Sequence, residues 1–163
     1  MLLRDKVVVV FGAAGSIGST TARIFAREGA RLFLAGRTLS KVEALAKDIT
    51  NNGGAASAAM VDALDEAQVE KYLDEVVQTA GSLDVLFNAI SMEDIQGPSL
   101  TTMPFEDFFH PIQKAESQFL TARTAARIMM QQGSGVLITI TEPAGTKPSH
   151  ACENVIRISC LFA

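Results

Sequence analysis

The sequence contains few of the residues that build metal sites, disulfide frameworks or membrane spans. Two cysteines and two histidines occur in 163 residues, and tryptophan is absent. Cys152 and Cys160 are too few and too close to the C-terminus for a disulfide framework, and His110 and His150 are isolated, so we expect no metal site. No apolar run approaches the roughly 18 residues of a membrane span. These shortages predict a reduced, cytoplasmic protein without a membrane partner.

Charge and composition are those of an ordinary globular domain. The net charge is −4, apolar residues make up 48% of the chain and charged residues 20%. An acidic chain without a basic patch is not expected to bind nucleic acid. The length suits one domain with a substantial core, so we expect residues 1–163 to form a single domain.

Apolar runs that are typical of buried strands alternate with amphipathic segments along the chain. The predicted strands cover residues 6–11, 31–35, 55–61, 83–87 and 136–141. Predicted helices cover residues 16–28, 104–110 and 111–132, and two more begin near Thr38 and at Asp65. Residues 104–132 are divided because Pro111 interrupts them. This alternation predicts an α/β fold: a Rossmann-like, doubly wound parallel sheet of order 3-2-1-4-5.

A glycine-rich turn follows the first predicted strand. Its sequence is Gly12-Ala13-Ala14-Gly15-Ser16-Ile17-Gly18. Glycine permits the tight turn and close helix packing, small residues let a pyrophosphate approach the backbone, and the helix N-terminus offers free N–H groups. We therefore predict a dinucleotide site that includes Gly12, Ala14, Ser16, Ile17 and Gly18. The alternative is a tight strand–helix turn that binds no ligand.

The second predicted strand ends near a basic residue. Arg37 stands nineteen residues after Gly18. An acidic residue near this place would bind the ribose 2′-hydroxyl of NAD, whereas an arginine can pair with the 2′-phosphate of NADP. Thr38 adds a hydroxyl donor. We therefore predict NADP rather than NAD as the cofactor, with a solvated loop arginine as the alternative.

Asp62 and Asn88 end the third and fourth predicted strands on the side of the crevice. We expect Asp62 to accept a hydrogen bond from the adenine amino group and Asn88 to fix the strand–loop transition beside the nicotinamide ribose. Local turn chemistry explains either residue about equally well. The residues that follow them, Ala63, Ala89 and Ile90, are expected to belong to the same site.

These segments together resemble the short-chain dehydrogenase/reductase family. Residues 11–18 resemble its Thr-Gly-x-x-x-Gly-x-Gly turn, and Val61-Asp62 resembles its adenine-contacting segment. Residues 84–91 are similar to the run that ends in Asn-Asn-Ala-Gly, and residues 133–141 to the run that leads to the catalytic serine. The resemblance implies hydride transfer between NADP(H) and a small-molecule alcohol or carbonyl substrate.

The same resemblance shows differences at the catalytic positions. The serine position falls on Glu142 and the asparagine position on Lys114. No Tyr-x-x-x-Lys occurs, and the only tyrosine, Tyr72, lies on a helix face that is expected to be core. Glu142 and Lys114 are therefore the catalytic candidates by position, although a solvated surface role is the favoured interpretation of both.

The C-terminal residues 153–161 resemble the family's sixth strand. Only residues 142–152 separate them from the fifth, and a crossover between parallel neighbours needs a dozen or more residues. The resemblance therefore implies a missing segment near Ser149 to Cys152, a domain incomplete at its C-terminal end and an irregular sixth strand. Loss of a packing helix would expose Met129 or Met130, so we expect a homo-oligomer.

Three functions remain open on the sequence alone. The first is an NADP-dependent oxidoreductase with altered catalytic residues. The second is a catalytically silent NADP-binding module that acts through binding or oligomerisation, which the missing tyrosine favours. The third is a truncated fragment with no function of its own.

Overall fold

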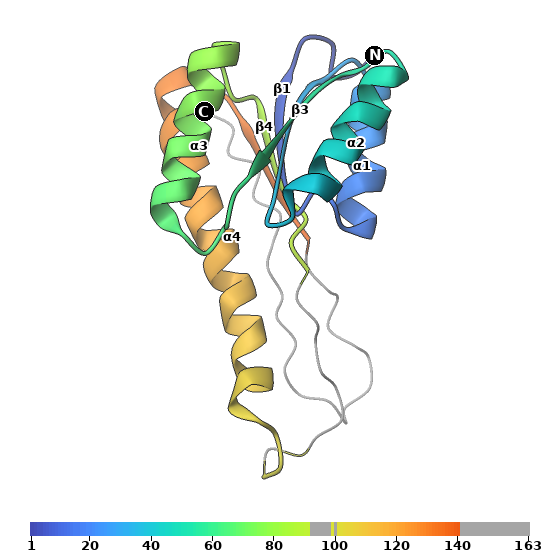
Figure 1. Ribbon diagram of the computed structural model, residues 1–163. Helices are drawn as coiled ribbons and strands as arrows, with labels where there is room; N and C mark the ends of the chain where they lie inside the picture. The colour runs from blue at the N-terminus through green and yellow to red at the C-terminus, as the bar shows by residue number, and fades with distance from the viewer. Residues whose placement is uncertain (92–98, 100, 141–163) are drawn as a thin grey trace.

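The sheet has the predicted order. In the computed structural model, which describes residues 1–91, 99 and 101–140, the strands form one parallel sheet ordered β3-β2-β1-β4-β5. The strands are β1 (Val7–Phe11), β2 (Arg31–Gly36), β3 (Ala55–Met60), β4 (Val85–Asn88) and β5 (Val136–Thr139). Figure 1 shows this sheet as the middle of three layers. The predicted Rossmann-like α/β class and strand order are therefore confirmed.

Helices cover both faces of the sheet. α1 (Ser16–Arg27) and α2 (Leu39–Asn51) lie on one face, and α3 (Glu66–Ala80) and α4 (Phe105–Gln132) lie on the other (Figure 1). One apolar cluster joins each pair of helices to the sheet. β1 is buried along its whole length, as expected of a valine-rich central strand of a parallel sheet.

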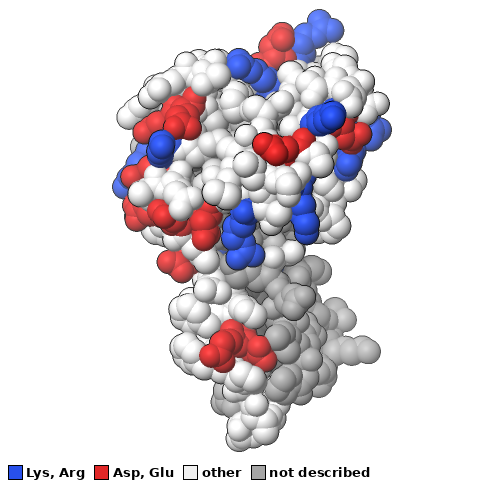
Figure 2. Space-filling view, viewed as in Figure 1, with Lys and Arg blue, Asp and Glu red and all other residues white. Residues whose placement is uncertain are grey.

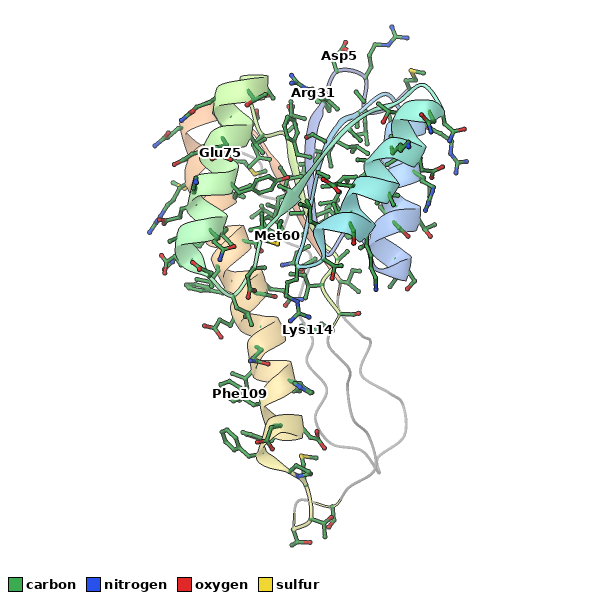
Figure 3. All side chains as sticks on the ribbon, viewed as in Figure 1. Asp5, Arg31, Met60, Glu75, Phe109 and Lys114 are labelled. Carbon is green, nitrogen blue, oxygen red and sulfur yellow. The ribbon has the colours of Figure 1, made fainter. Side chains whose placement is uncertain are left out.

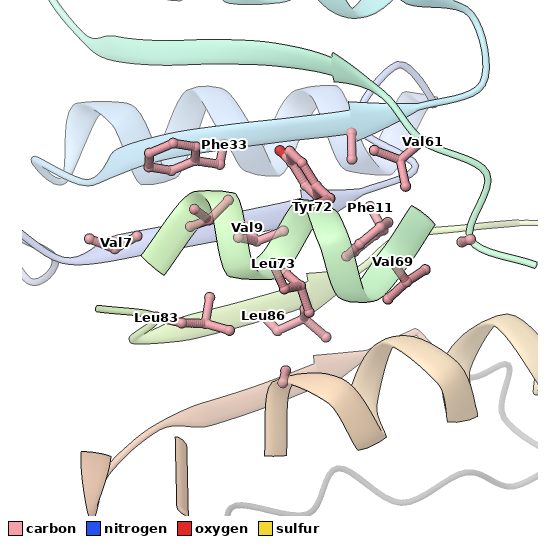
Figure 4. Packing of buried hydrophobic residues seen from close by; sticks show 14 of the residues in the cluster. Val7, Val9, Phe11, Phe33, Val61, Val69, Tyr72, Leu73, Leu83 and Leu86 are labelled. Carbon is pink, nitrogen blue, oxygen red and sulfur yellow. The ribbon is translucent and has the colours of Figure 1, made fainter. Parts of the chain in front are cut away.

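The cluster beneath α3 includes the only tyrosine of the chain. Figure 4 shows Tyr72 reaching from α3 toward the strands, near Phe11 and Phe33. The Phe11 and Tyr72 rings lie 5.9 Å apart, edge to face. Burial, with a smaller contribution from Glu75, raises the pKa of the Tyr72 phenol above its ordinary value. Tyr72 is therefore a core residue that stays protonated.

α4 differs from the sequence prediction because Pro111 lies inside one continuous helix. The prediction of separate helices over 104–110 and 111–132 was wrong. Proline removes the N–H that would bond to the Asp107 carbonyl, and its ring crowds that carbonyl. This part of α4 projects beyond the sheet, where the carbonyl can tilt outward and bond to water (Figure 1). The rings of Phe105 and Phe109 stack 5.6 Å apart across the preceding turn and support the helix there.

The face that α4 turns to the sheet also differs in part from the predicted one. The sequence predicts a buried stripe of Phe119, Ala122, Ala126 and Met129. The buried residues are instead Ser117, Gln118, Leu120, Thr121, Thr124, Ala125 and Met129. Phe119 is 59% exposed and Met130 78% exposed. Small and hydroxyl side chains thus face the sheet, and a second apolar stripe remains outside.

Some expectations lie outside the described residues. They are Glu142, His150, Cys152, Cys160, the segment near Ser149 and the sixth strand expected over 153–161. Across the residues that the structure does describe, no helix is long and apolar enough to cross a membrane. Those same residues contain no group of three or more metal-binding side chains.

Candidate functional site

A cleft lies at the carboxyl ends of the strands. Its volume is about 280 Å³, and loops that follow β1, β2, β3 and β4 line it. The parallel sheet brings these loops together at one edge, as expected for a doubly wound fold. The predicted site residues that line the cleft are Gly12, Ala14, Arg37, Thr38, Asp62, Ala63, Ala89 and Ile90.

Gly12 lets the β1 loop approach the β4 loop closely. Its φ is +71°, a conformation that residues other than glycine rarely adopt. A Cβ at this position would lie 2.8 Å from the carbonyl carbon of Ala89 and from the nitrogen of Ile90. The first turn therefore fits against the backbone of the opposite loop only without a side chain.

The N-terminus of α1 begins at the cleft and is uncapped. Gly15 is its N-cap residue, no side chain makes a capping hydrogen bond to the N–H groups of the first turn, and that turn contains no acidic residue. In α3, by contrast, the Asp65 carboxylate accepts a hydrogen bond from the Gln68 N–H at 3.1 Å, as its sequence predicted. A bare helix N-terminus attracts an anion through its N–H groups and partial positive charge. This end of the cleft fits a phosphate group.

Three residues predicted to bind the dinucleotide lie beside the cleft rather than in its lining. Ser16 and Ile17 are exposed on the first turn of α1, so their contribution would come from backbone N–H groups. Gly18 is buried, and a Cβ there would collide with the Gly12 carbonyl. Gly18 therefore lets α1 pack against the turn.

Positive charge and a hydroxyl stand at the β2 side of the cleft. Arg37 and Thr38 follow β2, and Lys41 lies in the first turn of α2. All three residues are exposed, and neither cation takes part in a salt bridge within the described part of the chain. Thr38 is the N-cap residue of α2, but its side chain makes no capping hydrogen bond. These groups are available to a second anion.

Sequence reasoning missed Lys41. It stands three residues after the N-cap Thr38, and residues three apart lie on the same side of a helix. A basic residue at that spacing after Arg37 and Thr38 was therefore a usable signal. Ser91 and Ser117 also line the cleft without having been predicted. Ser117 is fully buried, and its hydroxyl donates to the Lys114 carbonyl at 2.8 Å.

Asp62 lines the cleft beyond the end of β3. It is half-buried, and its Oδ1 accepts a hydrogen bond from the Leu64 N–H at 3.0 Å. The backbone N–H of Asp62 donates to the Gln68 side chain at 3.1 Å. The local turn chemistry considered at the sequence level is thus present, and it holds the carboxylate at the edge of the cleft.

Asn88 lies behind the cleft and does not line it. Its side chain is 2% exposed, its Nδ2 donates to the Thr121 hydroxyl at 2.9 Å, and its Oδ1 accepts from the Ile90 N–H at 3.0 Å. Asn88 therefore ties the β4 loop to α4. The residues that this bond holds in place, Ala89 and Ile90, do line the cleft.

Of the two catalytic candidates, Lys114 and Glu142, only Lys114 lies among the described residues. Lys114 is half-buried where α4 leaves the body of the protein, and it does not line the cleft (Figure 3). Glu142 lies outside the described residues. The described residues at the cleft therefore support binding of a ligand with two anionic groups, and Lys114 is not among those that line it.

Comparison with known proteins identifies relatives along almost the whole chain. A family model described as short chain dehydrogenase matches residues 6–153. The chain is 36% identical to an L-rhamnose 1-dehydrogenase (NAD(P)(+)) of Azotobacter vinelandii over 140 residues, which cover 83% of the chain and 54% of that protein. It is 30% identical to the uncharacterized oxidoreductase YxbG of Bacillus subtilis over 138 residues, 84% of the chain and 50% of the relative.

Solved structures agree with these matches. A metagenomic short-chain oxidoreductase in complex with NADP is 30% identical, with a TM-score of 0.81 over 91% of this chain and 67% of that one. An NAD⁺-bound xylitol dehydrogenase is 26% identical, with a TM-score of 0.84 over 92% of this chain and 58% of that one. The chain spans about half the length of these two curated relatives.

Proposed function

Because this chain belongs to the short-chain dehydrogenase family, we propose that its cleft binds NADP in preference to NAD. The observation that carries the proposal is the group of Arg37, Thr38 and Lys41 at one side of the cleft. The family's nicotinamide cofactors differ by one phosphate on the adenosine ribose, and two cations beside a hydroxyl favour the phosphorylated form.

In this proposal the two anionic groups of the cofactor meet different parts of the cleft. Gly12, Ala14 and the uncapped first turn of α1 bind the pyrophosphate, while Arg37 and Lys41 bind the 2′-phosphate with help from the Thr38 hydroxyl. Asp62 and Ala63 face the adenine. Asn88 acts as a positioning residue that holds Ala89 and Ile90 against the cofactor.

The reaction proposed for the whole protein is hydride transfer between NADP(H) and an alcohol or carbonyl substrate, with the bound nicotinamide supplying or accepting the hydride. Lys114 and Glu142 are its positional candidates for catalysis. A second candidate function is a catalytically silent NADP-binding module. The core position of Tyr72, which is buried beneath α3 and does not line the cleft, favours this second function. We also propose that residues 1–163 form one dinucleotide-binding domain, located in the cytoplasm and assembled as a homo-oligomer.

Paired substitutions at the two ends of β2 test the cofactor preference. Arg37→Gln should weaken NADPH binding on the order of 10- to 100-fold and leave NADH binding unchanged, since one charge-assisted contact to phosphate is lost. Arg31→Gln is the matched control, because Arg31 begins the same strand at the opposite end, far from the cleft (Figure 3). Equal weakening of both cofactors by Arg37→Gln would refute the proposed 2′-phosphate contact.

A turnover assay separates the two candidate functions. NADPH fluorescence is first used to establish binding, and NADPH oxidation is then followed with a panel of small carbonyl compounds. Binding with turnover supports the oxidoreductase. Binding without turnover supports the silent module, and absence of both supports the fragment without function.

A further inference from the structure

The N-terminus of α3 is closed by two side chains, unlike those of α1 and α2. Asp65 is its N-cap residue, and the Asp65 Oδ1 accepts a hydrogen bond from the Gln68 N–H at 3.1 Å. The Gln68 side chain returns to the cap, because its Nε2 donates to Asp65 Oδ2 at 2.8 Å. Neither Gly15 of α1 nor Thr38 of α2 makes a capping side-chain bond. We name Asp65 and Gln68 the α3 clamp.

The Gln68 amide departs from an ordinary capping box. In that motif the side chain three residues after the cap bonds to the N–H of the cap residue itself. Here the Gln68 Oε1 accepts instead from the Asp62 N–H at 3.1 Å, and the Asp65 N–H donates to the Asp62 carbonyl at 3.1 Å. The α3 clamp therefore joins the start of the helix to a residue that lines the cleft.

The ionisation of Asp65 fixes which way the Gln68 amide points. Hydrogen bonds from the Gln68 N–H and from its side chain lower the pKa of Asp65, so this carboxyl group is charged at neutral pH. A carboxylate only accepts hydrogen bonds, and the amide therefore turns its NH₂ group toward Asp65. Its oxygen is then left for the Asp62 N–H. A glutamate at position 68 could not make both contacts, because an ionised carboxylate donates nothing.

Asp62 is held at three points and keeps one carboxylate oxygen for a ligand. Its N–H is bonded to Gln68, its carbonyl to the Asp65 N–H and its Oδ1 to the Leu64 N–H. Among the described residues, no donor reaches its Oδ2. Asp62 is half-buried and lines the cleft. A carboxylate that is already held in place can accept a hydrogen bond from a ligand at little further cost in conformational entropy.

The charges around the cleft indicate which part of a nucleotide meets this carboxylate. Figure 2 shows acidic groups on the α3 side of the lower edge of the body and basic groups on the side of α2. Asp62 and Asp65 belong to the α3 side, whereas Arg37 and Lys41 belong to the other. The α3 side repels phosphate groups and attracts a neutral base that donates N–H groups. Adenine has that chemistry, because it presents an amino group.

We propose that Gln68 is a positioning residue for recognition of the base, and that the α3 clamp makes the cleft select a purine with an exocyclic amino group. This inference rests on the proposed binding of NADP. Gln68 does not line the cleft and acts through Asp62, whose free Oδ2 accepts a hydrogen bond from the amino group. Without the clamp, the loop that follows β3 is free to turn, and the carboxylate loses its direction.

Fluorescence titration with NADPH and with its hypoxanthine analogue, in which an oxygen replaces the adenine amino group, measures the selectivity for the base. The wild type should bind NADPH on the order of 10-fold tighter than the analogue, because the analogue loses one hydrogen bond to a charged group. Gln68→Ala should weaken NADPH binding and reduce this ratio to about 3-fold or less. Gln68→Glu should have the same effect, because it cannot donate to Asp65.

Two further variants separate this role from a merely structural one. Gln78→Ala is the matched control: Gln78 is exposed near the other end of α3, and its loss should leave the base selectivity unchanged. Arg37→Gln should alter the ratio of NADPH to NADH affinity and keep the selectivity for the base. Gln68→Ala should do the reverse, whereas a general loss of stability would weaken all three cofactors alike. Thermal unfolding checks the fold of each variant.

The titrations distinguish failure of this inference from failure of the proposed cofactor. If the wild type prefers NADPH to the hypoxanthine analogue and Gln68→Ala keeps that preference, Gln68 does not position Asp62, although the cofactor site stands. Equal binding of NADPH and the analogue by the wild type would likewise overturn the inference. If the wild type binds neither NADPH nor NADH, the proposed function is wrong, and the inference fails with it.

Discussion

Asp84 is expected to stabilise the fold in a pH-dependent way. It stands just before β4 and reaches the start of β1, where its carboxylate accepts hydrogen bonds from Lys6 Nζ at 2.8 Å and from the Val7 N–H at 2.9 Å. The Ser82 hydroxyl donates to it at 3.2 Å. Partial burial raises the pKa of Asp84, but these bonds and the charge of Lys6 outweigh it and hold the pKa below 3.8.

The expected effect of Asp84→Asn follows from these contacts. A hydrogen bond to a charged group contributes about 1.5–3 kcal/mol to stability. The loss should be smaller here for two reasons. Asn at position 84 can still accept the hydrogen bond from the Val7 N–H, and the ion pair with Lys6 is screened by solvent because the Lys6 side chain is 53% exposed. We expect a loss of about 1–2 kcal/mol at pH 7. Each kcal/mol corresponds to about 2–4 °C in Tm for a chain of this size.

The sign of the pH dependence is fixed by the direction of the shift. A carboxylate whose pKa is depressed by folding stabilises the native state above its unfolded pKa, and the stabilisation is lost as the pH falls through the folded pKa. Urea unfolding of the wild type and of Asp84→Asn from pH 7 down to pH 3 should show a constant difference above about pH 5 and a shrinking difference below 3.8. Asp74→Asn, at an exposed position of α3, is the control. An equal loss at pH 3 and pH 7 would mean that the charge of the Asp84 carboxylate does not stabilise the fold.

Three further substitutions test other parts of the structure. Gly12→Ala should cost about 1–2 kcal/mol in backbone strain and weaken NADPH binding at least about 10-fold, because its Cβ meets the β4 loop; unchanged binding in a titration would count against the cleft. Tyr72→Phe should leave the free energy of unfolding within about 0.5 kcal/mol or raise it, since the buried hydroxyl has no partner among the described residues; a large loss in urea unfolding would mean that the hydroxyl is bonded. Pro111→Ala should stabilise α4 by about 1–3 kcal/mol by restoring one helical hydrogen bond; destabilisation would contradict the continuous helix.

The strand order of the sheet could be predicted from the sequence because strong local patterns mark where its strands and helices begin and end. A run of valines followed by Gly12 is typical of a buried strand that leads into a tight turn. Asp65 with Gln68 marked the start of α3 for a similar reason. Pro111 led to the wrong prediction of two helices. The rule that proline ends a helix assumes that the carbonyl four residues earlier, here that of Asp107, finds no other hydrogen-bond donor. On the projecting part of α4, that carbonyl is in reach of solvent water, which can supply one (Figure 1).

The residues of the candidate site could be predicted only in part, because strand order places a loop but does not set the direction of each side chain. Residues such as Arg37 and Asp62 closely follow strands, and the carboxyl ends of parallel strands meet at one edge of a sheet, so the strand order alone predicted that these residues lie near one another. Lys41 was missed because its position depends on where α2 begins. Asn88 was assigned to the right loop, but its amide turns inward to Thr121 and reaches the cleft only through the backbone of Ile90. Side-chain direction of this kind depends on packing, which no local pattern contains.

The proposed preference for NADP depends on recognition of its 2′-phosphate at the β2 side of the cleft. The most direct test is a side-by-side fluorescence titration of the wild-type chain with NADPH and NADH under identical salt and pH. Two cations at the β2 side of the cleft predict that NADPH binds at least about 10-fold tighter than NADH. Equal dissociation constants, or tighter binding of NADH, would mean that Arg37 and Lys41 do not bind a 2′-phosphate.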